Sequence, residues 1–256
     1  MENQDPNQEY LQSIINLFTQ GQLQLALSEA TQMLEQYPNS VLLYNIAGAC
    51  NAGLMKFDAS IISYKQALKI KPDYAQAYYN IGNAQYENSD LEGAIESFKH
   101  AVKIKPDYCH AYNNMGIVLF DKGDLEAAIE SCKQALKIKA DFPQAFNNIG
   151  NILKEKGNLE AAISNYKKAI KIKPDYAECY SNLGDAFQLL NQTEQALLSY
   201  EKAISLKNDL NTAISGLGIV LLKKGEHIKG LDKLRQADGS ILFNIKSGLS
   251  IKQGDM

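Results

Sequence analysis

The sequence predicts an all-α protein, a solenoid of about seven stacked helix–turn–helix repeats. One pattern of apolar and small residues returns every 34 residues between residues 7 and 244. Each copy contains two stretches with helical spacing, and a short polar break separates them. Periods of about 20–50 residues are typical of chains whose structural units pack only against their neighbours.

The copy at 75–108 shows how one unit is built. Its first helix carries a stripe formed by Tyr78, Ile81 and Gly82, and its second runs from Leu91 until Pro106, which cannot continue a helix. Asp90 follows the polar break and is a good N-cap for the second helix. Gly82 and Ala94 are both small, so we expect them to face each other where the two helices cross closely.

We divide the chain into a polar lead (1–6), a repeat solenoid (7–244) and a C-terminal tail (245–256). The first copy has Ile14 where glycine is expected, and the pattern fades in the last copy, as expected for end repeats with one neighbour. Beyond Ala237 apolar and polar residues alternate, which predicts a short hairpin or another non-helical tail. The seven copies are 7–40, 41–74, 75–108, 109–142, 143–176, 177–210 and 211–244.

The proline that follows the second helix is absent from two of the six copies before the divergent last one. Ala140 and Asn208 stand in its place. Because proline ends a helix, we expect the second helices of these two copies to run on or to fray.

Composition indicates a soluble globular protein, with 45% hydrophobic and 21% charged residues. The net charge of −3 is close to neutral, whereas nucleic-acid-binding domains are usually strongly basic. The first ten residues lack the features of a signal peptide, and no apolar run is long enough to span a bilayer. We therefore expect a cytoplasmic protein that does not bind nucleic acid and has no membrane-spanning segment.

The sequence contains no recognisable catalytic or metal-binding motif, so we predict neither enzyme activity nor a cofactor or metal. The four cysteines form no CxxC pair, and we interpret them as buried or half-buried thiols. Cys109 and His110 are neighbours, but adjacent helical side chains diverge by about 100°, so they would point apart.

A 34-residue helix–turn–helix unit resembles the tetratricopeptide repeat. The residues that carry this resemblance in 75–108 are Tyr78, Ile81, Gly82, Ala94, Phe98, Ala101 and Pro106. The resemblance covers residues 7–244 and is strongest in the five inner copies. It implies a right-handed superhelical solenoid in which the first helix of each copy lines a concave groove.

By this resemblance, groove residues occupy the second, fifth, sixth, ninth, twelfth and thirteenth places of each copy. The sixth place forms a row of four asparagines, and the thirteenth place makes one edge of the groove acidic. The predicted peptide-binding residues are Asn80, Asn114, Asn148, Asn182, Asn83, Asn151, Asp185, Asn113, Asn147, Tyr79, Glu87, Asp121 and Glu155.

An asparagine side chain both donates and accepts hydrogen bonds, so a regular row can bind the amide groups of an extended peptide. The row is similar to the asparagine ladder in the repeat domains of O-GlcNAc transferases. The alternative is that asparagine belongs to the repeat pattern and contacts no ligand. The fifth and second places lack the lysines and arginines with which related domains hold acidic C-termini. An extended peptide that is neutral to basic is therefore the expected ligand.

Lysine is periodic on the second helices. We interpret these lysines as complements of helix C-termini and of nearby glutamates. The alternative is a surface for anionic lipid or nucleic acid. The three rows are Lys65, Lys99, Lys133 and Lys167; Lys69, Lys103, Lys137 and Lys171; and Lys71, Lys105, Lys139, Lys173 and Lys207.

The leading functional hypothesis is a non-catalytic scaffold that holds an extended segment of a partner protein in the groove. A second hypothesis is that the chain is the substrate-recognition arm of a larger enzyme of glycosyltransferase, sulfotransferase or oxygenase type, continuing past Met256. A third is self-assembly, since uncapped end repeats expose apolar faces and could form a homo-oligomer.

Overall fold

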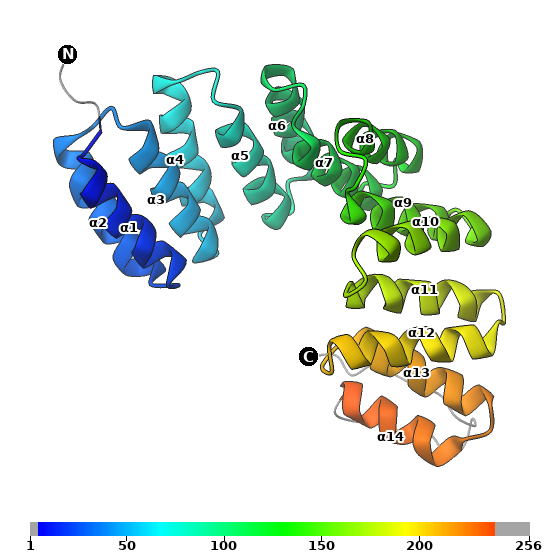
Figure 1. Ribbon diagram of the computed structural model, residues 1–256. Helices are drawn as coiled ribbons and strands as arrows, with labels where there is room; N and C mark the ends of the chain where they lie inside the picture. Colours follow the sequence, from blue (N-terminus) through cyan, green and yellow to red (C-terminus); the bar gives the residue numbers. More distant parts are fainter. Residues whose placement is uncertain (1–4, 239–256) are drawn as a thin grey trace. The chain divides into compact units, whose positions relative to one another are not determined.

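The computed structural model describes residues 5–238, and the tail predicted at 245–256 lies outside this range. The described residues form helices joined by short turns, with no strand among them (Figure 1). The chain divides into two compact units, 1–138 and 139–256. The first unit contains α1 (Gln8–Thr19), α2 (Leu23–Gln36), α3 (Val41–Gly53), α4 (Phe57–Ile70), α5 (Ala75–Glu87), α6 (Leu91–Ile104), α7 (Cys109–Asp121) and α8 (Leu125–Ile138). The second contains α9 (Pro143–Glu155), α10 (Leu159–Ile172), α11 (Ala177–Leu189), α12 (Thr193–Leu206), α13 (Asn211–Lys223) and α14 (His227–Asp238).

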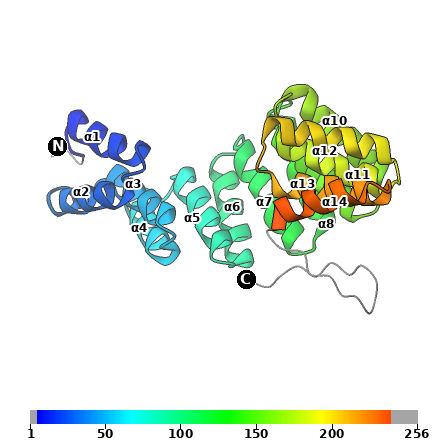
Figure 2. The same ribbon diagram turned by 90° about the horizontal axis from the view of Figure 1, so that it is seen from below.

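Within each unit the helices pack in the order of the sequence, as a stack of helix pairs (Figure 2). The first helix of a pair contacts its own second helix and also the first helix of the next pair, as α3 contacts α4 and α5. All-α repeat architecture is therefore confirmed, and each pair supplies one first helix to a shared surface.

Polar residues at the sixteenth place begin the second helices. Asp90 Oδ1 accepts a hydrogen bond of 2.9 Å from the backbone N–H of Gly93. Asp124 and Asn158 make the same contact with the residue three places later, at 3.1 and 3.3 Å. These side chains satisfy backbone donors that have no partner within the helix, which confirms the predicted N-cap.

The residue just before this cap, at the fifteenth place, has a positive φ in every copy. Glycine occupies the place four times, at Gly21, Gly123, Gly157 and Gly225, with φ from 76° to 89°. The other three copies have Met55, Ser89 and Asn191, with φ of 59°, 62° and 57°. The left-handed conformation reverses the chain between the two helices, and side-chain-bearing residues adopt it at a cost.

Glycine at the eighth place makes room for an aromatic ring. A Cβ atom on Gly82 would lie 2.7 Å from Cε1 of Phe98, so the nearest side chain is Phe98 and not Ala94, as the sequence led us to expect. Phe98 is fully buried. The same arrangement recurs with Gly150 against Tyr166 and with Gly184 against Tyr200.

The second helices that lack the proline end at the same place as those that have it. α8 ends at Ile138 and α12 at Leu206, both at the thirtieth place, as α6 does at Ile104. The expectation that they run on was wrong. The backbone N–H of Leu210 donates to the carbonyl of Lys207, and that of Tyr108 donates to the carbonyl of Lys105, so this turn forms with or without proline.

Candidate functional site

The sixth-place asparagines of the first unit bind the preceding helix pair. Asn80 Nδ2 donates to Asn45 Oδ1 at 3.3 Å. Asn114 Nδ2 lies 3.1 Å from the Tyr79 hydroxyl and 2.9 Å from Asn83 Oδ1. These side chains are half-buried. Their donors therefore connect neighbouring first helices, which limits what they offer to a ligand.

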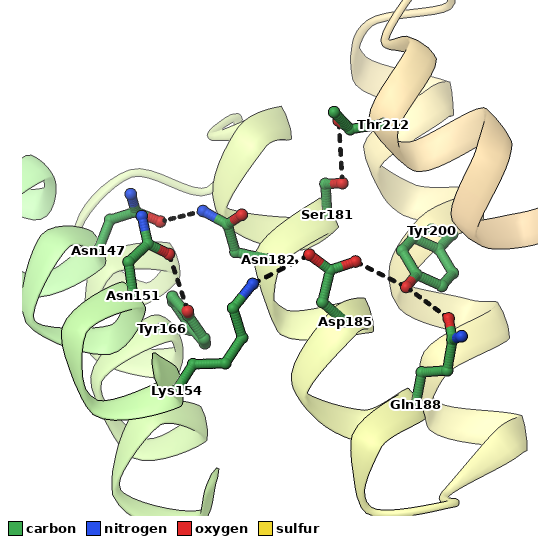
Figure 3. Close-up of polar contacts among 10 residues, drawn as sticks. All are labelled: Asn147, Asn151, Lys154, Tyr166, Ser181, Asn182, Asp185, Gln188, Tyr200 and Thr212. Atoms are coloured by element: carbon green, nitrogen blue, oxygen red, sulfur yellow. Dashed lines mark hydrogen bonds and ion pairs between the residues drawn. The ribbon is translucent and has the colours of Figure 1, made fainter. Parts of the chain in front are cut away.

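In the second unit Asn182 makes the same kind of contact, with Nδ2 donating to Asn147 Oδ1 at 3.0 Å (Figure 3). Asn148 is also half-buried. Three of the four asparagines of the predicted row, Asn80, Asn114 and Asn182, thus form hydrogen bonds between successive repeats of one unit.

The fifth place is not the open surface that the resemblance implied. Asn113 and Asn147 are only 5% and 6% exposed, and Tyr79 is half-buried. The reason is that this place lies where the sixth-place side chain of the next repeat reaches across, as Asn182 reaches Asn147. Asn113 and Asn147 are consequently poor candidates for direct contact with a ligand.

The ninth-place residues of the second unit bind tyrosine hydroxyls of their own second helices. The Tyr166 hydroxyl donates to Asn151 Oδ1 at 2.8 Å. The Tyr200 hydroxyl lies 2.8 Å from Asp185 Oδ1, and Lys154 Nζ donates to Asp185 Oδ2 at 3.1 Å (Figure 3). Burial, followed by the Asp185 charge, raises the pKa of both tyrosines well above the usual range. Both hydroxyls are thus neutral donors.

A pocket of about 350 Å³ opens between α3 and α5 in the first unit. Three of the predicted residues, Asn80, Asn83 and Glu87, form one side of it. The other side was not predicted: it is apolar and aromatic, with Tyr64 from α4 as a wall. The remaining lining residues are Ala49, Ala52, Met55, Phe57 and Ala84.

An equivalent pocket of about 550 Å³ lies between α11 and α13 in the second unit. Tyr200, at the same place of its copy as Tyr64, forms the wall. A Cβ on Gly216 would lie 2.4 Å from Tyr200 Cζ, and one on Gly184 would lie 2.7 Å from Cε1, so the ring lies between two glycines. The remaining lining residues are Lys154, Asp185, Gln188, Leu189, Asn211, Thr212, Ser215 and Ile219.

The acidic thirteenth place is exposed at Glu87, Asp121 and Glu155. Asp121 accepts a hydrogen bond from the Tyr86 hydroxyl. Burial raises the pKa of Tyr86 to about 12, and the bond to Asp121 acts in the same direction. Since Tyr86 remains protonated at neutral pH, its hydroxyl donates to Asp121.

Four lysines of the third row lie over an aromatic ring of their own copy. Lys71 Nζ lies 5.6 Å from the ring centroid of Tyr74, and Lys105 Nζ lies 5.2 Å from that of Tyr108. Lys139 and Lys173 lie over the aromatic residue three places later in the same way. Lys207, the fifth lysine of the row, forms an ion pair with Glu178 at 3.2 Å. Cation–π contacts and ion pairs thus account for this row within the fold.

The residues described by the structure contain no cluster of acidic, histidine or cysteine side chains able to hold a metal ion. Cys50, Cys132 and Cys179 are buried, and burial raises the pKa of Cys132 and Cys179 to about 12. Cys109 Sγ lies 3.5 Å from His110 Nδ1, so these neighbours do meet, contrary to the expected divergence.

Between residues 5 and 238 no helix is both long and apolar enough to cross a membrane.

Comparison with known proteins defines the class to which these helix pairs belong. A TPR repeat model matches residues 56–89, 116–157 and 150–191, and tetratricopeptide repeat models match 75–108 and 177–210. Together the matches cover more than half of the 256 residues. The chain therefore belongs to the tetratricopeptide repeat family, and the repeats make it a protein–protein interaction scaffold.

Solved structures share the fold. A chain of the APC/C hetero-tetramer Cut9-Hcn1 matches 91% of this chain at 14% identity with a TM-score of 0.75, and the match covers 46% of that chain. MamA matches 61% of this chain at 26% identity with a TM-score of 0.54, and the match covers 92% of MamA. YrrB, a TPR protein with an unusual peptide-binding site, matches 72% of this chain at 21% identity with a TM-score of 0.55, and the match covers 95% of YrrB. No curated protein sequence matches significantly.

Proposed function

We propose that this chain binds an extended segment of a partner protein along the surface formed by the first helices of its repeats. The observation that carries the proposal is the recurrence of one pocket in both units. In each case the pocket lies between successive first helices, with a tyrosine of the intervening second helix as its wall. A pocket that recurs at the same places of the repeat suits an extended chain, whose side chains alternate in direction.

The structure changes the role that we assign to the asparagines. The side-chain amides of Asn80, Asn114 and Asn182 donate hydrogen bonds to the preceding repeat. We therefore assign them to holding neighbouring repeats together and not to direct contact with a ligand. The groups left for a partner lie in the pockets. Gln188 Nε2 and Ser215 Oγ make no hydrogen bond to other described residues, and both line the pocket of the second unit. Exposed carboxylates such as Glu87 favour a neutral to basic segment.

The test compares two substitutions to arginine, one in a pocket and one outside. Ala52 is half-buried and lines the first-unit pocket, whereas Ser164 is exposed on the second helix α10. Proteins captured from host lysate would be identified by mass spectrometry, and overlapping synthetic peptides of each would be titrated by fluorescence anisotropy. We expect one short peptide to bind wild type and Ser164→Arg, and to bind Ala52→Arg at least about tenfold more weakly.

Two outcomes contradict the proposal. In one, no linear peptide of any captured protein binds, so that recognition needs a folded partner. In the other, Ser164→Arg abolishes binding and Ala52→Arg preserves it, which would assign recognition to the second helices. Circular dichroism of both variants confirms that the helices remain formed.

A further inference from the structure

The first-unit pocket contains a residue that the backbone alone does not favour. Met55 has a φ of 59°, at the place where four other copies have glycine, and its side chain is 75% exposed. A residue with a side chain is less stable than glycine in the left-handed region, because its Cβ crowds the backbone. A large apolar side chain that is strained and also exposed at a pocket is best explained by contact with another molecule.

The pocket combines this thioether with an aromatic ring and one carboxylate. Met55 and Phe57 lie at the apolar side, and Glu87 lies opposite, on the last turn of α5. Glu87 is exposed and makes no ion pair with another described residue. Asn80 is already bonded to Gln76 and Asn45. Glu87 is the charged residue in the lining of this pocket and is available to a ligand.

These features select one class of side chain. An acidic residue would be repelled by Glu87, and a purely apolar residue would cover the carboxylate without pairing it. Lysine and arginine have an apolar stem and a terminal cation, so the stem can lie along Met55 and Phe57 while the cation reaches Glu87. Resting on the proposed function, we propose that this pocket anchors a lysine or arginine side chain of the bound segment.

The second unit offers an internal contrast. The acid in its pocket, Asp185, already accepts from Lys154 at 3.1 Å and from Tyr200 at 2.8 Å. The fifteenth place of that copy is Asn191, which does not line the pocket. The basic anchor therefore belongs to the first unit, and the second pocket accepts a side chain without a required charge.

The experiment selects peptides from a random dodecapeptide display library on the full 256-residue chain. We expect one position to be enriched in lysine or arginine, and its replacement by norleucine to weaken binding about tenfold. Glu87→Gln should weaken binding equally, while Glu96→Gln, an exposed charge change on α6, should leave affinity unchanged. Met55→Gly should also weaken binding, although it relieves backbone strain. Glu87→Lys should restore affinity for the peptide in which glutamate replaces the basic residue.

The outcomes separate the anchor from the proposed function. If peptides bind without a basic preference and Glu87→Gln has wild-type affinity, the anchor is overturned while peptide binding stands. If lysine-containing and arginine-containing peptides bind equally, the cation alone is recognised, and a preference for arginine would indicate bidentate pairing. If no peptide binds, both the anchor and the proposed function are overturned.

Discussion

Replacing Ser60 by alanine should make the protein more stable. Ser60 lies on α4 and is completely buried, and its Oγ makes no hydrogen bond of normal geometry to a described residue. It interacts only weakly with the Tyr64 hydroxyl, whose pKa it lowers against the larger effect of burial. Five other copies have alanine at this place, and all five alanines are also completely buried: Ala26, Ala94, Ala128, Ala162 and Ala196. The hydroxyl is thus a polar atom in a site that the repeat otherwise keeps apolar.

Two contributions to the free energy of unfolding have the same sign. A buried polar group without a partner costs about 1–3 kcal/mol, which Ser60→Ala removes. Serine is also a weaker helix former than alanine by up to about 0.7 kcal/mol. The loss of one oxygen atom leaves a very small cavity, so we expect a net gain of about 1–2 kcal/mol, or roughly 2–8 °C in Tm for a chain of this size.

Urea unfolding monitored by circular dichroism measures this gain, with the reciprocal variant Ala94→Ser as the matched control. We expect the control to lose stability by a similar amount, because Phe98 beside it offers no hydroxyl. If Ser60→Ala has unchanged or lower stability while Ala94→Ser is destabilised, Ser60 has a partner in solution and the reasoning fails. Equal slopes of the unfolding free energy against urea would show that the unfolded state is unaffected.

Three further outcomes are expected. Gly82→Leu should lower the free energy of unfolding by about 1–3 kcal/mol in a thermal melt, because the ring beside it already lies within contact of a single added carbon. Cys109, which is partly exposed, should be the cysteine that a thiol reagent labels in the native protein, and rapid labelling of buried Cys132 would contradict its raised pKa. Burial raises the pKa of Tyr86 and Tyr108 to about 12 in the fold, so their contribution to stability is complete below pH 10 and is lost as pH rises from 10 towards 12. Urea midpoints that stay constant up to pH 12 would refute this.

The helix pairs could be predicted from sequence because their determinants are local. Helical spacing, the cap at Asp90 and the 34-residue period all act within one unit. The expectation that the helices before Ala140 and Asn208 run on was wrong, since α8 and α12 end at the usual place. Near Asn208 the turn is formed by a backbone hydrogen bond, from Leu210 to Lys207, that does not need proline. The burial of Asn113 was missed because the spacing within one helix does not show where the next repeat packs.

The candidate site was only partly predictable. Sequence placed Asn80, Asn83 and Glu87 on one helix, and the structure brings all three to one pocket. It did not indicate Met55, which lies in a turn and not on the first helix. The signal was nevertheless present, since methionine stands there where most copies have glycine, serine or asparagine.

The ring of Tyr200, lying between Gly184 and Gly216, bears on whether the repeats are interchangeable modules. Gly216 occupies the sixth place, where four preceding copies have asparagine, and a Cβ there would lie 2.4 Å from Cζ of the ring in its present position. Tyrosine and asparagine do stand together at another junction, since Tyr64 and Asn80 line one pocket. A copy transplanted from 143–176 to follow residue 210 would therefore require the Tyr200 ring to move from its present place between the two glycines. Shortening or extending this array requires junctions to be matched, not only units to be counted.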